Sequence, residues 1–113
     1  MSVLSQTKTE RIRELNDKAR QTFTGCVLTL TQGVDALCTE VKAEVLRRVR
    51  EFNRFDTDND PYHEHDFGAF NIGPAKFFFK WDYYDRTLEA GSEDPADPSK
   101  TTRVLTVMLA DEY

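Results

Sequence analysis

The first half of the chain carries apolar residues at the spacing of an α-helix in two places. The first place covers residues 5–22, and its apolar stripe would consist of Ile12, Leu15, Ala19 and Phe23. At its start the hydroxyl of Thr7 or Thr9 can accept hydrogen bonds from free backbone N–H groups, and Gly25 is expected to mark its end. The pattern therefore predicts a first helix over residues 5–22.

The second helical stretch follows a short strand. Residues 26–31 (CVLTLT) alternate, so that Cys26, Leu28 and Leu30 would share one face of a strand. The pair at 32–33 indicates a turn. Helical spacing then returns from Asp35 or Thr39 to residue 54, and its apolar side would hold Val41, Val45, Val49 and Phe52.

The second half of the chain shows the period of two that is typical of strands. Residues 67–72 and 76–84 predict a hairpin around the turn at 73–75. One face of its second strand would hold Phe77, Phe79, Trp81 and Tyr83, and the other Lys76, Phe78, Lys80, Asp82 and Tyr84. Residues 85–101 predict a loop. Residues 102–110 predict a last strand, with a short C-terminal helix as the alternative.

These elements predict an α+β fold of one domain over residues 1–113. Their order is α-β-α-β-β-β, and we expect two helices packed on one face of an antiparallel sheet of about four strands. The helices are needed there because an all-aromatic strand face has to be covered.

The composition of the chain predicts the size of its core and its location in the cell. The 113 residues include 39% hydrophobic and 12% aromatic residues, enough for one buried core. Residues 1–6 hold no secretory apolar segment, and no apolar run approaches the ~20 residues of a membrane span. Cys26 and Cys38 form no metal-binding or disulfide pattern and are expected to be buried thiols. We therefore expect a cytoplasmic protein without membrane contact.

The charge of the chain is unevenly distributed. The net charge of −5 divides into +3 over residues 1–55 and −8 over residues 56–113. Such a split favours two electrostatically different faces, and an acidic face repels nucleic acid and attracts basic protein surfaces. Arg47, Arg50 and Arg54 could contact phosphates, but interleaved glutamates favour a solvated helix face. Direct nucleic-acid binding is therefore not expected.

The acidic loop at residues 56–66 contains more candidate metal-ligating side chains than any other segment. Its start resembles a calcium-binding EF-hand loop, but Pro61 and Phe67 stand where that motif needs Gly and Glu. His63 and His65 would project to the same side of an extended backbone, and with Asp66 they form a candidate metal site. This site would support a metal-assisted hydrolase as an alternative function; otherwise no cofactor is expected and an enzyme is not favoured.

A protein-binding surface is the favoured interpretation of the acidic half. Its candidate residues combine acids with exposed aromatics, a composition expected of interfaces. They are Asp56, Asp58, Asp60, Tyr62, Glu64, Asp82, Tyr84 and Asp85, with Trp81 as a further aromatic anchor. The partner would be a host protein with a basic surface. The remaining alternative is a regulatory or structural homodimer formed through an exposed sheet edge.

Several motifs resemble one bacterial family. They are the segments 58–62 (DNDPY), 64–68 (EHDFG), 77–80 (FFFK), 82–85 (DYYD), 94–98 (DPADP) and 101–106 (TTRVLT). Over residues 11–113 the chain resembles the domain-of-unknown-function family numbered 3768. The resemblance implies a short cytoplasmic protein, often encoded on mobile elements, with no known catalytic residue. The family pattern has no histidine at the position of His63, which weakens the candidate metal site. The mobile-element setting suggests a counter-defence inhibitor, such as a DNA-mimicking anti-CRISPR or anti-restriction protein.

Overall fold

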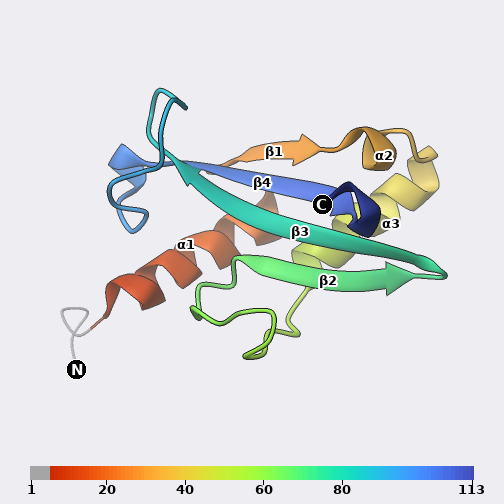
Figure 1. Cartoon of the computed structure of the whole chain (residues 1–113), viewed down its shortest axis with the longest axis horizontal. Helices are drawn as coiled ribbons and strands as arrows, with labels where there is room; N and C mark the ends of the chain where they lie inside the picture. Colours follow the sequence, from red (N-terminus) through yellow and green to blue (C-terminus); the bar gives the residue numbers. More distant parts are fainter. Residues whose placement is uncertain (1–5) are drawn as a thin grey trace.

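Helices and strands follow one another along the chain in nearly the predicted order. The computed structural model describes residues 6–113 (Figure 1). Its elements are α1 (Lys8–Thr22), β1 (Val27–Leu30), α2 (Gln32–Asp35), α3 (Thr39–Glu51), β2 (Phe67–Ile72), β3 (Ala75–Tyr84), η2 (Pro98–Lys100), β4 (Thr102–Leu109) and η3 (Ala110–Glu112). The turn predicted at 32–33 is part of the short helix α2, and α3 ends three residues before residue 54.

Helix α1 is capped by Thr7, one of the two predicted cap residues. The Thr7 hydroxyl accepts the N–H of Glu10, whose carboxylate accepts the N–H of Thr7 in return. The predicted start at residue 5 lies outside the described residues, but residues 6 and 7, which were also predicted to be helical, precede the helix. The helix ends at Thr22, as predicted. Its C-cap Phe23 has a left-handed backbone (φ 55°), and Gly25, which was expected to mark the end, follows two residues after the cap.

The four strands form one mixed sheet in the order β1-β4-β3-β2. The prediction of a purely antiparallel sheet is wrong, because β1 pairs with β4 in parallel. Helix α3 returns the chain to the end of the sheet where β1 began, so β2 runs parallel to β1. Two reversals, β2 to β3 and β3 to β4, then make β4 parallel to β1 as well.

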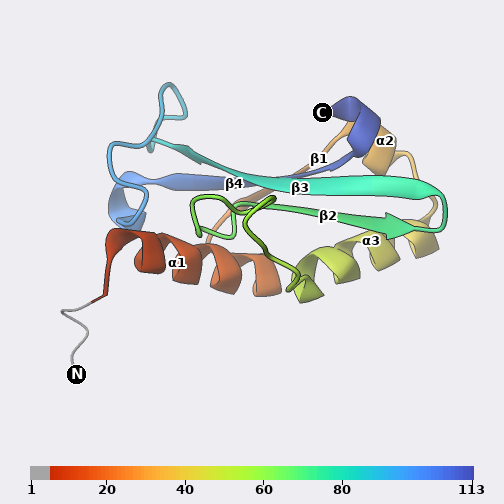
Figure 2. The same ribbon diagram turned by 60° about the horizontal axis from the view of Figure 1, so that its bottom comes forward.

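Helices α1 and α3 cover one face of this sheet (Figure 2). As predicted, Phe77, Phe79 and Trp81 of β3 point into this inner face and are buried. Val45 and Val49 of α3 pack into the same core. The predicted arrangement of two helices on one sheet face is confirmed.

The outer face of the sheet is not covered by α1 or α3. It carries the alternate side chains of β3, including Phe78, Lys80, Asp82 and Tyr84. The C-terminal η3 rises on this side of the sheet, where the Tyr113 ring contacts Phe78 (Figure 2).

Two further predictions concern thiols and membranes. Both cysteines are free. Cys26 is half-buried, but Cys38 is exposed at the start of α3, so the prediction that both are buried is wrong for Cys38.

None of the helices within residues 6–113 has the length and apolar character of a membrane span.

Candidate functional site

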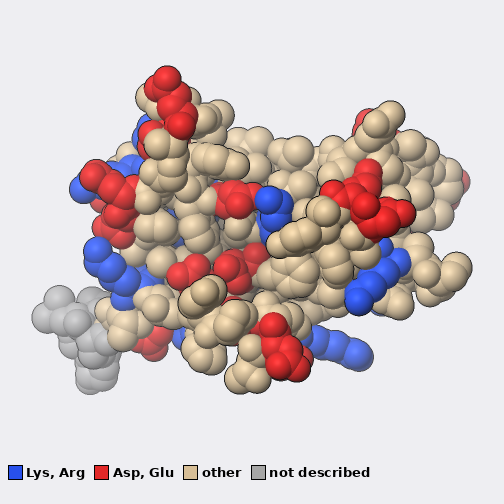
Figure 3. Space-filling view, viewed as in Figure 1, with Lys and Arg blue, Asp and Glu red and all other residues tan. Residues whose placement is uncertain are grey.

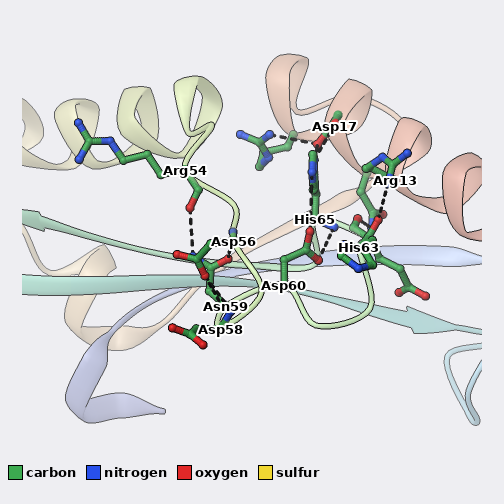
Figure 4. Close-up of polar contacts among 12 residues, drawn as sticks. Arg13, Asp17, Arg54, Asp56, Asp58, Asn59, Asp60, His63 and His65 are labelled. Atoms are coloured by element: carbon green, nitrogen blue, oxygen red, sulfur yellow. Dashed lines mark hydrogen bonds and ion pairs between the residues drawn. The ribbon is translucent and has the colours of Figure 1, made fainter.

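The first half of the acidic loop is a turn organised by Asp56. Its Oδ1 accepts the backbone N–H of Asp58 at 2.9 Å and that of Asn59 at 3.0 Å (Figure 4). The Asn59 side chain in turn accepts the N–H of Asp56 and donates to the carbonyl of Arg54. The polar residues that suggested a calcium loop therefore bond to the backbone of their own turn, and Asp58 is left exposed.

The second half of the loop is anchored to α1 through His65. Its Nδ1 lies 2.9 and 3.0 Å from the two carboxylate oxygens of Asp17 (Figure 4). Its ring stacks on Phe55, with centroids 3.8 Å apart. Its backbone N–H donates to Asp60, which is only 3% exposed. The prediction that Asp60 contributes to a partner-binding surface is therefore wrong, because its carboxylate is used inside the loop.

The backbone does not place the two histidines as the candidate metal site requires. Both His63 (φ 60°) and His65 (φ 54°) are left-handed, so the extended geometry that would direct both rings to one side is absent at these residues. The His63 side chain is exposed, and its carbonyl accepts from Arg13 at 3.0 Å. Across residues 6–113, no group of three or more His, Cys, Asp or Glu side chains is arranged to hold a metal ion.

Beside the loop lies a depression of about 460 Å³, which we call the acidic hollow. Its lining residues come from the loop, β2 and the C-terminus: Asp56, Asp58, Asn59, Pro61, Tyr62, Asp66, Phe67 and Tyr113. Tyr62 at its rim is 70% exposed. The hollow thus combines three carboxylates with three aromatic rings.

The aromatic side of the acidic hollow continues onto the outer sheet face. Phe67, Phe78 and Tyr113 form a cluster with ring centroids 5.0 to 6.1 Å apart. Phe67 also stands opposite Lys80 in the strand register. The acidic hollow and the outer face are therefore one continuous surface.

The electrostatics of the acidic hollow favour a positively charged ligand. Burial raises the pKa of Asp66 and the nearby Asp60 carboxylate adds to this, and together they outweigh the lowering by the backbone N–H of Asp66 and by His65. Ionised Asp66 is thus insufficiently compensated, and a cation placed beside it would stabilise its charged form.

The other predicted site residues are dispersed. Asp82 forms an ion pair with Lys80 at 2.9 Å on the outer face, where Tyr84 is also exposed. Asp85 accepts the backbone N–H groups at positions 87 and 89 of its own loop. Trp81 is 4% exposed, so its predicted role as a surface anchor is wrong. The structure brings three predicted partner-binding residues, Asp56, Asp58 and Tyr62, together in the acidic hollow, where Asp66 of the candidate metal site also lies.

Glu64 belongs to a partly buried polar network. Its Oε1 accepts the Tyr83 hydroxyl at 3.0 Å. The Asn16 amide donates to that hydroxyl at 2.8 Å and to the Glu64 carbonyl at 3.0 Å, and it accepts from Arg103 Nε at 2.9 Å. Burial raises the pKa of both Glu64 and Tyr83. This network joins the acidic loop to α1, β3 and β4.

A second buried contact, made by Arg20, holds α1 against α3. The Arg20 guanidinium donates to the Val49 carbonyl at 2.7 Å and pairs with Asp17 at 3.2 Å. It also lies 5.4 Å from the ring centroids of Phe55 and Phe79. Because Asp17 also holds His65, the position of the loop depends on the packing of the two helices.

Sequence reasoning missed Phe67 and Tyr113 as parts of the surface and Asn16 as the centre of the network. Asn16 had a usable signal, because it follows Leu15 within the apolar side of α1 and a polar residue there needs partners. Tyr113 had none, because its contact with Phe67 joins segments far apart in the chain.

Acidic and basic side chains are interspersed on the face of the molecule that Figure 3 shows. Figure 3 shows several separate groups of Asp and Glu, with Lys and Arg between them. The acidic half of the sequence therefore does not produce one unbroken acidic face in this view.

Comparison with known proteins gives a family but no activity. The family model described as "Protein of unknown function (DUF3768)" matches residues 30–112. No curated protein and no solved structure matches the chain.

Proposed function

The chain belongs to the DUF3768 family, since the match covers most of its length, and from this premise we propose that it is a small protein-binding module. Its acidic hollow and the adjoining outer sheet face dock on a basic surface of a partner protein. The observation that carries the proposal is the meeting of three carboxylates and exposed aromatic rings in the acidic hollow.

The recognised group is a lysine or arginine side chain of the partner. A cation in the acidic hollow would contact Asp58 and Asp66 while lying against the rings of Tyr62 and Tyr113. Charge-assisted hydrogen bonds and cation–π contacts both become stronger when water is displaced. The half-buried Asp66 supplies a charge that such a cation would compensate.

The uncovered sheet face supplies the remaining contact area. Phe78 and Tyr84 offer apolar surface, and Lys80 and Asp82 already satisfy each other. A central anchor surrounded by such mixed surface is the usual anatomy of a protein interface.

We limit the proposed function to protein binding, and the DNA-mimicking inhibitor suggested by the family resemblance stays a prediction. A DNA mimic needs a continuous acidic face, because nucleic-acid channels bind a regular row of phosphates. The charges on the outer face in Figure 3 are mixed in sign.

The test is affinity capture from a lysate of the source organism with a double variant, Asp56→Asn and Asp58→Asn. Asparagine keeps an oxygen that can accept the turn hydrogen bonds, so the change removes two charges and preserves the loop. We expect recovery of the main partner to fall by about tenfold or more, because losing a charged contact costs roughly 1.5–3 kcal/mol.

The matched control is Glu89→Gln with Glu93→Gln, which removes the same charge from exposed positions outside the acidic hollow. It should capture the partner as wild type does. Equal capture by both double variants, or no partner captured by wild type, contradicts the proposal.

A further inference from the structure

A second depression, of about 370 Å³, lies on another part of the molecule and has the opposite charge. We call it the cationic hollow. It is enclosed by α1, the turn that follows α1, the loop 85–101 and β4; in Figure 1 this loop lies at the end of the sheet. Its lining residues are Leu15, Lys18, Ala19, Thr24, Gly25, Arg86, Pro98, Thr101 and Arg103. None of these is acidic, although the chain carries a net charge of −5.

Three cations from three separate segments line the cationic hollow, and its lining contains no carboxylate. Lys18, Arg86 and Arg103 form no ion pair with any residue of the described part of the chain. The groove beside α3 differs in this respect, because its Arg47 is paired with Glu44 at 2.6 Å and with Glu51 at 2.7 Å. The unpaired cations of the cationic hollow can therefore accept an external anion.

Arg103 is a buried and positioned member of this set. It is 4% exposed, and its Nε donates to Asn16 Oδ1 at 2.9 Å while Nη2 donates to the Pro95 carbonyl. Its guanidinium lies 5.3 Å from the Tyr83 ring centroid. Burial is the main cause that lowers the pKa of Arg103, and the nearby Arg11 also lowers it, whereas Tyr83 and Glu64 raise it. The folded structure already holds this guanidinium in one orientation, so an anion that binds it does not have to immobilise it.

The remaining lining of the cationic hollow includes apolar side chains beside Thr24 and Thr101. Leu15, Ala19 and Pro98 offer a surface against which a flat or aliphatic part of a ligand can pack. Small-molecule sites typically combine such apolar walls with a few placed polar groups, in volumes of roughly 300–1,000 Å³.

From these observations we infer that the cationic hollow binds a small molecule that carries a phosphomonoester and an apolar group. A phosphomonoester carries about −1.5 to −2 charges at neutral pH and matches three cations better than a single carboxylate does. Arg86 and Arg103 would bind phosphate oxygens, and Lys18 would supply a further charge. This inference is independent of protein binding through the acidic hollow, which is lined by other residues.

The test is isothermal titration of the purified chain with adenosine monophosphate, inorganic phosphate and adenosine, at constant ionic strength. We expect saturable one-to-one binding of adenosine monophosphate, weaker binding of phosphate and no binding of adenosine. The double variant Lys18→Gln with Arg86→Gln should weaken binding by about tenfold or more. Arg103 is left intact, because its buried bonds also support the fold.

The matched control is Arg54→Gln with Lys76→Gln, which removes two exposed cations outside the cationic hollow. Its affinity for adenosine monophosphate should stay within about twofold of wild type. The inference is overturned if no phosphorylated probe binds saturably, if both double variants bind equally, or if adenosine binds as well as its monophosphate. Tighter binding of a single-stranded DNA decamer than of the monophosphate would also overturn it, since it indicates a nucleic-acid surface.

Discussion

Asn16 shows how one residue can hold distant parts of this protein together. It lies on the buried side of α1 with no exposed surface, among apolar neighbours such as Ala19. Its amide makes three hydrogen bonds: two by donation, to the Glu64 carbonyl and the Tyr83 hydroxyl, and one by acceptance, from Arg103. Buried amides are tolerated only when they are satisfied in this way.

We expect Asn16→Ala to destabilise the protein by about 2–4 kcal/mol, because it leaves buried polar partners, including the Arg103 guanidinium, without one of their bonds. Chemical denaturation measured by circular dichroism gives this value. The control Asn53→Ala changes the same side chain at an exposed position and should stay within about 0.5 kcal/mol of wild type. Equal stability of both variants would contradict the role assigned to Asn16.

At the scale of elements, β2 can lie close to α3 because it contains Gly68. Gly68 pairs with Phe79 across the strands, and a Cβ atom added there would overlap the Phe79 ring and lie 2.9 Å from Phe52. These two rings pack edge to face with centroids 5.2 Å apart. The position of β2, which carries Phe67 into the acidic hollow, therefore depends on a missing side chain.

Gly68→Ala is expected to cost about 1–3 kcal/mol of stability, because the methyl group overpacks the contact between the sheet and α3. Thermal unfolding followed by circular dichroism measures the loss. Gly91→Ala is the control, since its Cβ would have no neighbour closer than 3.9 Å, and it should be nearly neutral. A neutral Gly68→Ala would mean that the rings move apart easily.

At the scale of the whole molecule, Glu112 connects the end of the chain to the segment after β1. Its carboxylate accepts the Thr31 hydroxyl at 2.5 Å, the Gly33 N–H at 2.8 Å and the Leu109 N–H at 2.8 Å. These bonds lower the pKa of Glu112, and the hydrogen bond from Thr31 has the largest effect. The same connection places the following residue, Tyr113, at the acidic hollow.

Because the pKa of Glu112 is lowered in the folded state, its stabilising effect is present above the unfolded value, near 4.5, and disappears as the pH falls through the folded value. We expect Glu112→Gln to lower Tm at pH 7, and the difference from wild type to shrink as the pH falls below 4.5. Asp111→Asn, an exposed neighbour, is the control and should follow wild type. A difference that is independent of pH would exclude the charge as its cause.

The candidate surface was predictable only in part. Asp56, Asp58 and Tyr62 could be found because they lie together in one polar loop, and the structure keeps them together. Asp60 occurs in the same loop with the same composition, yet it is buried against His65. Composition does not distinguish these two outcomes, because they depend on which carboxylate the backbone of the folded loop directs inward.

The sequence by itself determined the two main helices, the alternation of the strands and the side of β3 that faces the helices, because these follow from local periodicity. It also limited the cap of the first helix to Thr7 or Thr9, and the structure selects Thr7. Only the tertiary structure decided that β1 lies parallel to β4, that Tyr113 completes the acidic hollow, and that three cations meet in the cationic hollow. These features join residues far apart in the chain, and their positions depend on how whole elements pack.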